Sequence, residues 1–208
     1  MRNSTLVILS TLLLSFSGGD PDLYKKQIVS HFTDWFAYNK KNKTGFSISY
    51  FSKKKTEAYS YEFDFPLENE EVDSVQSKMY YWSPDSSYYL DIYSYAYWFS
   101  VDSGRVYLSG QEPECAVFLY SPWEKKGYRM TFGGSESDFE DAAWFSKSCF
   151  AVAGSEITGS NFDSVYNFVE VFDLGRNTKT WYEGAPYKRD KKRASYVQQK
   201  AEKVLLGK

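Results

Sequence analysis

A short aromatic stretch at residues 79–90, MYYWSPDSSYYL, constrains the fold more than any other part of the chain. Its centre is a polar turn, in which Pro84 fixes the backbone φ angle at about −65° and Asp85 can bond to the turn's own backbone. A run of apolar and aromatic residues lies on each side, which is typical of strands because such side chains fit a pleated surface. The stretch therefore predicts an antiparallel pair of strands.

A weaker copy of this unit occurs at residues 143–152, where Trp144 again precedes a polar turn and a second apolar strand. Each copy is followed by a predicted hairpin, the first over residues 116–134 and the second over residues 168–182. Repeated short strands joined by turns predict a mainly β protein built from antiparallel sheets.

The Trp-Ser-Pro-Asp turn at residues 82–85, followed by an apolar strand, resembles the blades of β-propellers of the TolB and Trp-Asp-repeat kind. The Val-x-Val-Phe-Asp-Leu strand at residues 169–174 is similar to such blades as well. The resemblance covers residues 74–184 and implies blade-like hairpins. Two blades are too few to close a propeller ring, so the resemblance implies no functional residues.

Residues 1–17 predict a secretory signal peptide. Arg2 supplies a short positive segment, an apolar run follows, and small residues stand at the predicted cleavage site. The run is shorter than the ~20 residues that a bilayer-spanning helix needs. We therefore expect an exported protein, either secreted or held in the periplasm or cell envelope. The alternative is a buried N-terminal helix or a retained anchor.

The remaining chain has the length of one domain, and residues 18–187 predict a single β-rich domain. Its first segment, residues 20–39, predicts an amphipathic helix with apolar side chains on one face. Residues 188–208 predict a basic, helical C-terminal tail. The tail helix either docks on the domain or forms a basic arm that contacts an acidic surface or lipid headgroups.

Another hairpin is predicted over residues 45–66, with strands at residues 46–51 and 59–65 around a lysine-rich turn. The acidic segment that follows, residues 67–77, predicts a solvated loop, with a calcium site as the alternative.

Aromatic residues make up 20% of the chain, and 19 of them are tyrosines, which demands an explanation. Cross-strand aromatic pairs within sheets would account for many of them. The alternative is a face that stacks on sugar rings or on a partner protein. The candidate binding residues are Trp82, Tyr95, Tyr97 and Trp123.

Catalytic motifs are scarce in this sequence. His31 is the only histidine, and it falls inside the predicted N-terminal helix, so neither a catalytic triad nor a multi-ligand zinc site is expected. We expect no cofactor and no metal. The formal net charge is −2, and the only long basic cluster is at the C-terminus, which gives a nucleic-acid role little support.

These observations favour a non-enzymatic binding or structural protein that contacts a protein or a glycan. One alternative is a carbohydrate-active enzyme with carboxylates at a sheet edge, for which Asp138, Glu140 and Asp141 are candidates. Another is a partial propeller that another chain completes.

Cys115 and Cys149 are the only cysteines, and we expect them to form a disulfide. An exported protein meets an oxidising compartment, and adjacent blade-like segments could bring the two Cα atoms within the ~5.5–6 Å that a bridge needs. The alternative is that each is a buried free cysteine, acting as a small core residue.

Overall fold

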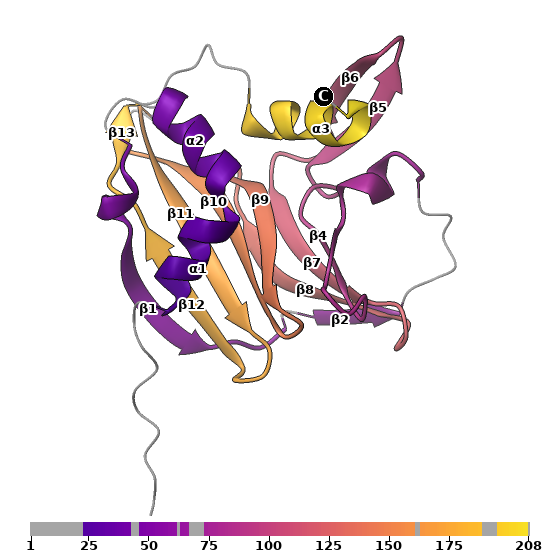
Figure 1. Cartoon of the computed structure of the whole chain (residues 1–208), viewed down its shortest axis with the longest axis horizontal. Helices are drawn as coiled ribbons and strands as arrows, with labels where there is room; N and C mark the ends of the chain where they lie inside the picture. Colours follow the sequence, from indigo (N-terminus) through magenta and orange to yellow (C-terminus); the bar gives the residue numbers. More distant parts are fainter. Residues whose placement is uncertain are drawn as a thin grey trace, which may run out of the picture.

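The computed structural model describes residues 23–42, 46–61, 63–66, 73–160, 163–188 and 195–207. This part of the chain is mainly β, with two large antiparallel sheets, a separate hairpin and α-helices near both ends (Figure 1). The predicted fold class is therefore confirmed. The predicted signal peptide, residues 1–17, lies outside the described residues.

Sheet A has the strand order β1-β12-β11-β10-β9, and β13 also pairs with β11. Its strands are β1 (Ser52–Ala58), β9 (Ser137–Ser146), β10 (Cys149–Thr158), β11 (Ser164–Asp173), β12 (Thr178–Glu183) and β13 (Tyr187–Lys188). The predicted strand pair around Trp144 is the β9–β10 hairpin, with Trp144 opposite Phe150. The predicted hairpin that follows it is β11–β12.

Sheet B has the strand order β2-β8-β7-β4-β3. Its strands are β2 (Phe63–Pro66), β3 (Tyr81–Trp82), β4 (Tyr89–Asp91), β7 (Cys115–Ser121) and β8 (Lys126–Gly133). The predicted turn at residues 79–90 joins β3 to β4. The amide of Ser83 donates to the carbonyl of Tyr88 at 2.9 Å, and the amide of Ser87 donates to Asp85 at 3.2 Å. This unit and the β7–β8 hairpin confirm the strand-turn-strand predictions.

The hairpin predicted over residues 45–66 is wrong. Its supposed lysine-rich turn is part of β1, which pairs with β12 in sheet A, whereas β2 pairs with β8 in sheet B. Ile48–Tyr50 form a short 3-10 helix, η1. Every residue of β1 is exposed, because β1 is an edge strand of sheet A, so its sequence lacks the alternation that marks a half-buried strand. Lysines on such an edge discourage pairing with other chains.

The N-terminal segment forms two helices, α1 (Leu23–His31) and α2 (Thr33–Asn42), where one helix over residues 20–39 was predicted. Both pack on the outer face of sheet A (Figure 1). Ile28, Trp35 and their apolar neighbours are buried there, which confirms the predicted apolar face.

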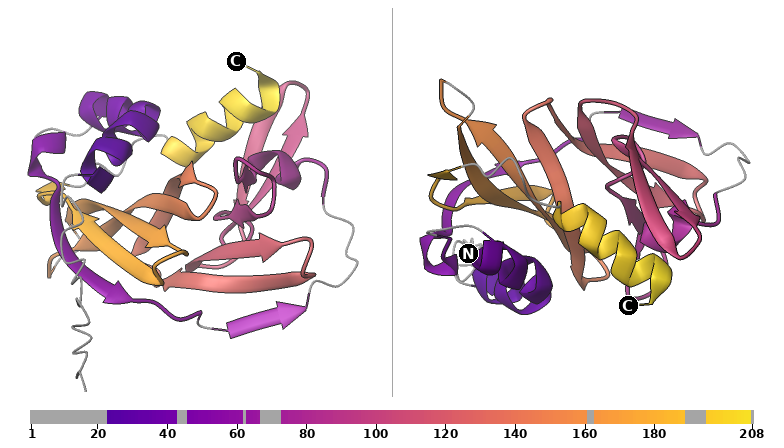
Figure 2. Two further views of the ribbon diagram at one scale, coloured as in Figure 1. Left: turned by 60° about the horizontal axis from the view of Figure 1, so that its bottom comes forward. Right: turned by 90° about the horizontal axis from the view of Figure 1, so that it is seen from above.

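The C-terminal helix α3 (Tyr196–Leu206) is capped at its N-terminus by Ser195, whose hydroxyl accepts a hydrogen bond from the amide of Gln198. Val197 and Ala201 are fully buried in the main core. The helix lies against the hairpin of β5 (Tyr97–Asp102) and β6 (Arg105–Gly110), and against the 3-10 helix η2 (Gln76–Met79) (Figure 2). The tail helix thus docks on the domain.

The main core lies between the two sheets. Leu90 and Leu119 of sheet B pack with Phe150, Phe168 and Phe172 of sheet A in one buried cluster. Among the described residues, no helix has the length and apolar character needed to cross a bilayer.

Candidate aromatic binding face

A row of residues crosses the whole outer face of sheet B. Five opposed positions, one from each strand, form it in the order β2-β8-β7-β4-β3: Phe65, Gly127, Tyr120, Tyr89 and Trp82. Directly opposed residues in a sheet point to the same side. The adjacent positions, such as Leu90 and Leu119, point into the core, so this row faces outward.

Tyr89 is the centre of a stack of aromatic rings. Its ring centroid lies 4.8 Å from that of Tyr80 and 4.8 Å from that of Tyr120, with interplanar angles of 14° and 18°. Trp82 leans on Tyr89 at 4.9 Å. Tyr89 therefore stacks on a ring on each of two neighbouring positions, and its own ring faces are largely covered.

A second group of rings continues this surface. Phe118 contacts both Phe65, at 5.8 Å between centroids, and Tyr95, at 6.3 Å. Tyr95 also contacts Phe132 at 5.8 Å, and the guanidinium of Arg129 lies 5.1 Å from the centre of the Phe132 ring. We call the eight aromatic residues of the two groups the aromatic face: Phe65, Tyr80, Trp82, Tyr89, Tyr95, Phe118, Tyr120 and Phe132.

Gly127 is the one position in the row without a side chain. A Cβ atom there would lie 2.4 Å from Cζ of Phe65 and 3.0 Å from Tyr120, so the Phe65 ring occupies the space above the glycine. An aromatic ring from a neighbouring strand that covers a glycine protects the exposed backbone and fixes the register. The aromatic surface is therefore continuous from β2 to β7.

The aromatic face is open to solvent. Trp82 is 50% exposed and Phe132 is 39% exposed, while the stacked tyrosines are half-buried. Helices α1, α2 and α3 lie on the other side of the molecule from β2 (Figure 2). Contiguous exposed apolar patches are a feature of interaction sites, which makes the aromatic face a candidate.

The stacked tyrosines keep their hydroxyl protons at neutral pH. Burial, with a further contribution from Asp91, raises the pKa of Tyr89 to about 12. Burial and the Asp91 carboxylate also raise the pKa of Tyr80. Both hydroxyls therefore remain hydrogen-bond donors as well as acceptors.

The structure brings together two of the four predicted binding residues. Trp82 and Tyr95 both belong to the aromatic face. Trp123 lies in the turn between β7 and β8, outside the row, and is 84% exposed. Tyr97 lies elsewhere, on β5, where its hydroxyl donates to Asp138 at 3.0 Å.

Sequence reasoning missed most of the aromatic face. Tyr80 carried a signal, because it stands two residues before Trp82 and so shares its side of an extended chain. Tyr120 and Phe65 carried none, since they join the row only through the strand order β2-β8-β7-β4.

The acidic residues of β9 anchor the helices. Glu140 occupies a β-bulge, because Phe139 pairs with Gly154 while Asp141 pairs with the adjacent Ala153. The buried Glu140 carboxylate accepts hydrogen bonds from the Trp35 indole of α2, at 2.5 Å, and from the hydroxyl of Ser155, at 2.9 Å.

Asp141 is buried too, and it holds α3. Its carboxylate accepts hydrogen bonds from the hydroxyls of Tyr196, at 2.6 Å, and Tyr81, at 2.8 Å. The ammonium of Lys200 lies 3.0 Å away. Both carboxylates of the bulge thus have structural partners.

The predicted disulfide between Cys115 and Cys149 is not formed, because both are buried free cysteines. Cys115 belongs to the core between the sheets, and its thiol lies 3.4 Å from the carbonyl of Ser137. Cys149 belongs to the separate cluster beneath α1 and α2. Burial raises the pKa of both thiols to about 12, which keeps them unreactive.

Comparison of the chain with protein-family models, with curated proteins and with solved structures finds no match.

Proposed function

We propose that this chain is an exported, non-enzymatic binding protein of the cell envelope or extracellular space, and that its aromatic face contacts a partner protein. One observation carries the proposal: a row with aromatic side chains at four of its five positions, and with the Phe65 ring over the glycine at the fifth, crosses sheet B on a side that the described helices leave open. Export rests on the signal-like N-terminal segment.

The composition and geometry of the face favour a protein over a glycan. Sugars stack on free ring faces, but Tyr89 at the centre of the face is already stacked on Tyr80 and Tyr120. Trp, Tyr and Arg dominate the binding energy of protein interfaces. Tyrosines that are already held in place also lose little conformational entropy on binding.

A role without catalysis is consistent with the environment of the acidic residues. A glycosidase needs two carboxyl groups that flank a substrate. Glu140 and Asp141 are instead buried and hydrogen-bonded to residues of α2 and α3. Their positions support an anchoring role.

The proposal can be tested with two tryptophan variants of similar exposure. Trp82→Ala removes the exposed indole of the face, whereas Trp98→Ala removes one on β5 that is 42% exposed and lies outside the face. Each protein is immobilised, incubated with the envelope fraction of the source cells, and its retained proteins are quantified by mass spectrometry. We expect a partner that the wild type and Trp98→Ala retain equally and that Trp82→Ala retains about tenfold less.

A glycan array probed with the same three proteins separates the two partner classes. Equal protein retention by all three would contradict the proposal. Array signals that only Trp82→Ala loses would identify the partner as a glycan.

A further inference from the structure

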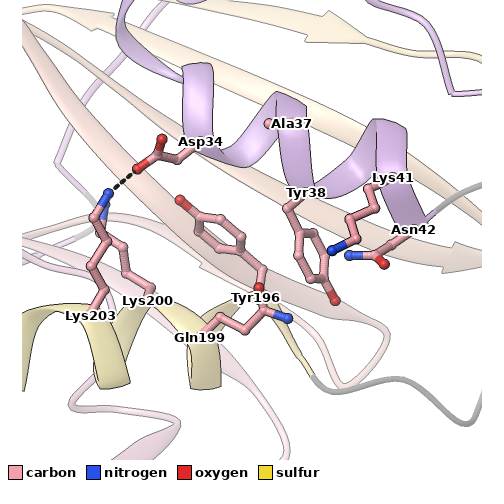
Figure 3. Close-up of a pocket in the computed structure, with 9 residues that line it drawn as sticks. All are labelled: Asp34, Ala37, Tyr38, Lys41, Asn42, Tyr196, Gln199, Lys200 and Lys203. Carbon is pink, nitrogen blue, oxygen red and sulfur yellow. Dashed lines mark hydrogen bonds and ion pairs between the residues drawn. The ribbon is translucent and has the colours of Figure 1, made fainter. Parts of the chain in front are cut away.

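A second site lies between α2 and α3 and uses none of the residues of the aromatic face (Figure 3). An open cavity of about 360 Å³ separates the two helices there. This volume falls in the range of small-molecule sites, roughly 300–1,000 Å³. Its walls come from one side of each helix: Asp34, Ala37, Tyr38, Lys41 and Asn42 on α2, and Tyr196, Gln199, Lys200 and Lys203 on α3.

The two walls are held in fixed positions. At one end of the cavity, Lys203 and Asp34 form an ion pair of 2.5 Å between the helices (Figure 3). The rings of Tyr38 and Tyr196 meet edge to face, 5.3 Å apart. Tyr196 and Lys200 are also bonded to the buried carboxylate of Asp141. A cavity whose walls are already positioned binds a ligand at a lower entropic cost.

The cavity has one positive charge more than its acidic groups can balance. Of its three lysines, Lys203 is paired with Asp34 and Lys200 with Asp141. Lys41 has no carboxylate within ion-pairing distance among the described residues. A ligand with a single negative charge would therefore neutralise the charge of Lys41.

Two neutral side-chain amides line the cavity as well. In Figure 3, Asn42 lies beside Lys41 and Tyr38 on α2, and Gln199 lies beside Tyr196 on the facing helix α3. Within the described part of the chain, neither side-chain amide has a hydrogen-bond partner. Each amide offers both donors and an acceptor, which is what a ligand hydroxyl group requires. The Tyr38 ring adds an apolar surface.

We propose that this cavity binds a small hydroxylated carboxylate of monosaccharide size, with a hexuronic acid as the model ligand. Lys41 pairs with the carboxylate, and Asn42 and Gln199 bond to hydroxyl groups. One unmatched ammonium favours a carboxylate over a phosphate monoester, which carries about −1.5 to −2 charges at neutral pH.

The test measures the affinity of the full chain for four probes by isothermal titration calorimetry: D-glucuronate, acetate, D-glucose and glucose 6-phosphate. Acetate has the charge without the hydroxyls, glucose has the hydroxyls without the charge, and glucose 6-phosphate has both but with excess charge. We expect glucuronate to bind at least about tenfold more tightly than each of the other three.

Two lysine variants locate the site. Lys41→Gln removes the unmatched charge, and Lys40→Gln makes the same change at the adjacent exposed residue, which does not line this cavity. We expect Lys41→Gln to weaken glucuronate binding about tenfold and Lys40→Gln to leave it unchanged. Absence of glucuronate binding, equal weakening by the two variants, or tightest binding of acetate, glucose or glucose 6-phosphate would each overturn the proposal.

Discussion

The outer faces of the two sheets differ in how their apolar and aromatic side chains are shielded from water. On sheet A many of the outward residues are small, such as Ala151, Ala153 and Val171, and they are fully buried beneath α1 and α2 together with the larger Tyr182. On sheet B the outward residues are large aromatics without a covering helix, and they are only partly buried.

The two faces are ordered by different contacts. Small side chains let a helix approach closely, and the helix supplies the large groups, chief among them Trp35. On sheet B, Tyr89 stacks on Tyr80 and Tyr120, so the tyrosines cover part of one another's ring surface while the face stays partly exposed to water. A surface that is ordered without a covering element is consistent with the proposed binding role.

The largest loss of stability should come from a substitution beneath the helices that cover sheet A. Trp35 is fully buried, and its indole donates to the buried Glu140 carboxylate. Trp35→Ala removes that packing and leaves a buried carboxylate short of a donor, so we expect a loss of about 3–5 kcal/mol in the free energy of unfolding. Urea denaturation measures this loss.

Trp123→Ala is the matched control, because Trp123 is 84% exposed and should contribute less than about 0.5 kcal/mol. Similar losses in the two variants would mean that α2 does not cover sheet A in solution.

The tyrosine stack should contribute less than the covered face. Tyr89→Leu keeps an apolar side chain but removes two stacked ring pairs, so we expect a loss of about 1–3 kcal/mol. Tyr107→Leu on β6, where the tyrosine is 48% exposed, should change stability by less than about 0.5 kcal/mol. Denaturant melts in which both variants match the wild type would show that the stack does not order the face.

A substitution at Gly127, the glycine in the row, should cause a smaller loss of stability. The new methyl group in Gly127→Ala displaces the Phe65 ring, which should cost about 1–2 kcal/mol. Gly110→Ala, where a Cβ meets nothing within 4 Å, should be neutral or slightly stabilising. If thermal melts show Gly127→Ala to be as stable as Gly110→Ala, Phe65 does not cover the glycine.

The smallest expected effect is a pH dependence of the free energy of unfolding. It comes from Glu170, which is buried in the core between the sheets. Burial raises the pKa of Glu170, and the ammonium of Lys179, 3.4 Å away, acts in the opposite direction. As the pH falls to the raised pKa, the folded state binds a proton before the unfolded state does. Stability should therefore rise with falling pH until about pH 4.3, by at most about 1.4 kcal/mol per pH unit.

Glu170→Gln should remove this rise, so its stability should depend less on pH than that of the wild type. Glu57→Gln is the control, because Glu57 also lies near Lys179, at 3.9 Å, but is exposed. Equal pH slopes for the wild type and Glu170→Gln in urea melts from pH 5 to 7 would exclude the effect.

The sequence predicted the local hairpins but not how they assemble. The turn that contains Pro84 and the turn after Trp144 were recognisable, because turn chemistry and the apolar strands are both local signals. Strand β1 escaped recognition, because an exposed edge strand such as Ser52–Ala58 has no buried side to leave a pattern.

The aromatic face was only partly predictable for the same reason. Trp82 could be chosen from the sequence, since it lies beside a turn in an aromatic strand. That Tyr89 stacks on Tyr120, about thirty residues later, depends on β4 pairing with β7, and no local pattern specifies that pairing. The expected disulfide failed because strand order places Cys115 and Cys149 in different clusters.

The most direct test of the aromatic face is hydroxyl-radical footprinting of the wild-type protein, alone and with the envelope fraction. Trp82 and Trp98 have similar exposure, at 50% and 42%, so both should be oxidised readily in the free protein. If the aromatic face binds the partner, oxidation of Trp82 should fall several-fold on binding while that of Trp98 stays the same. Unchanged oxidation of Trp82 in the bound sample, or protection of Trp98 alone, would contradict the assignment of this face.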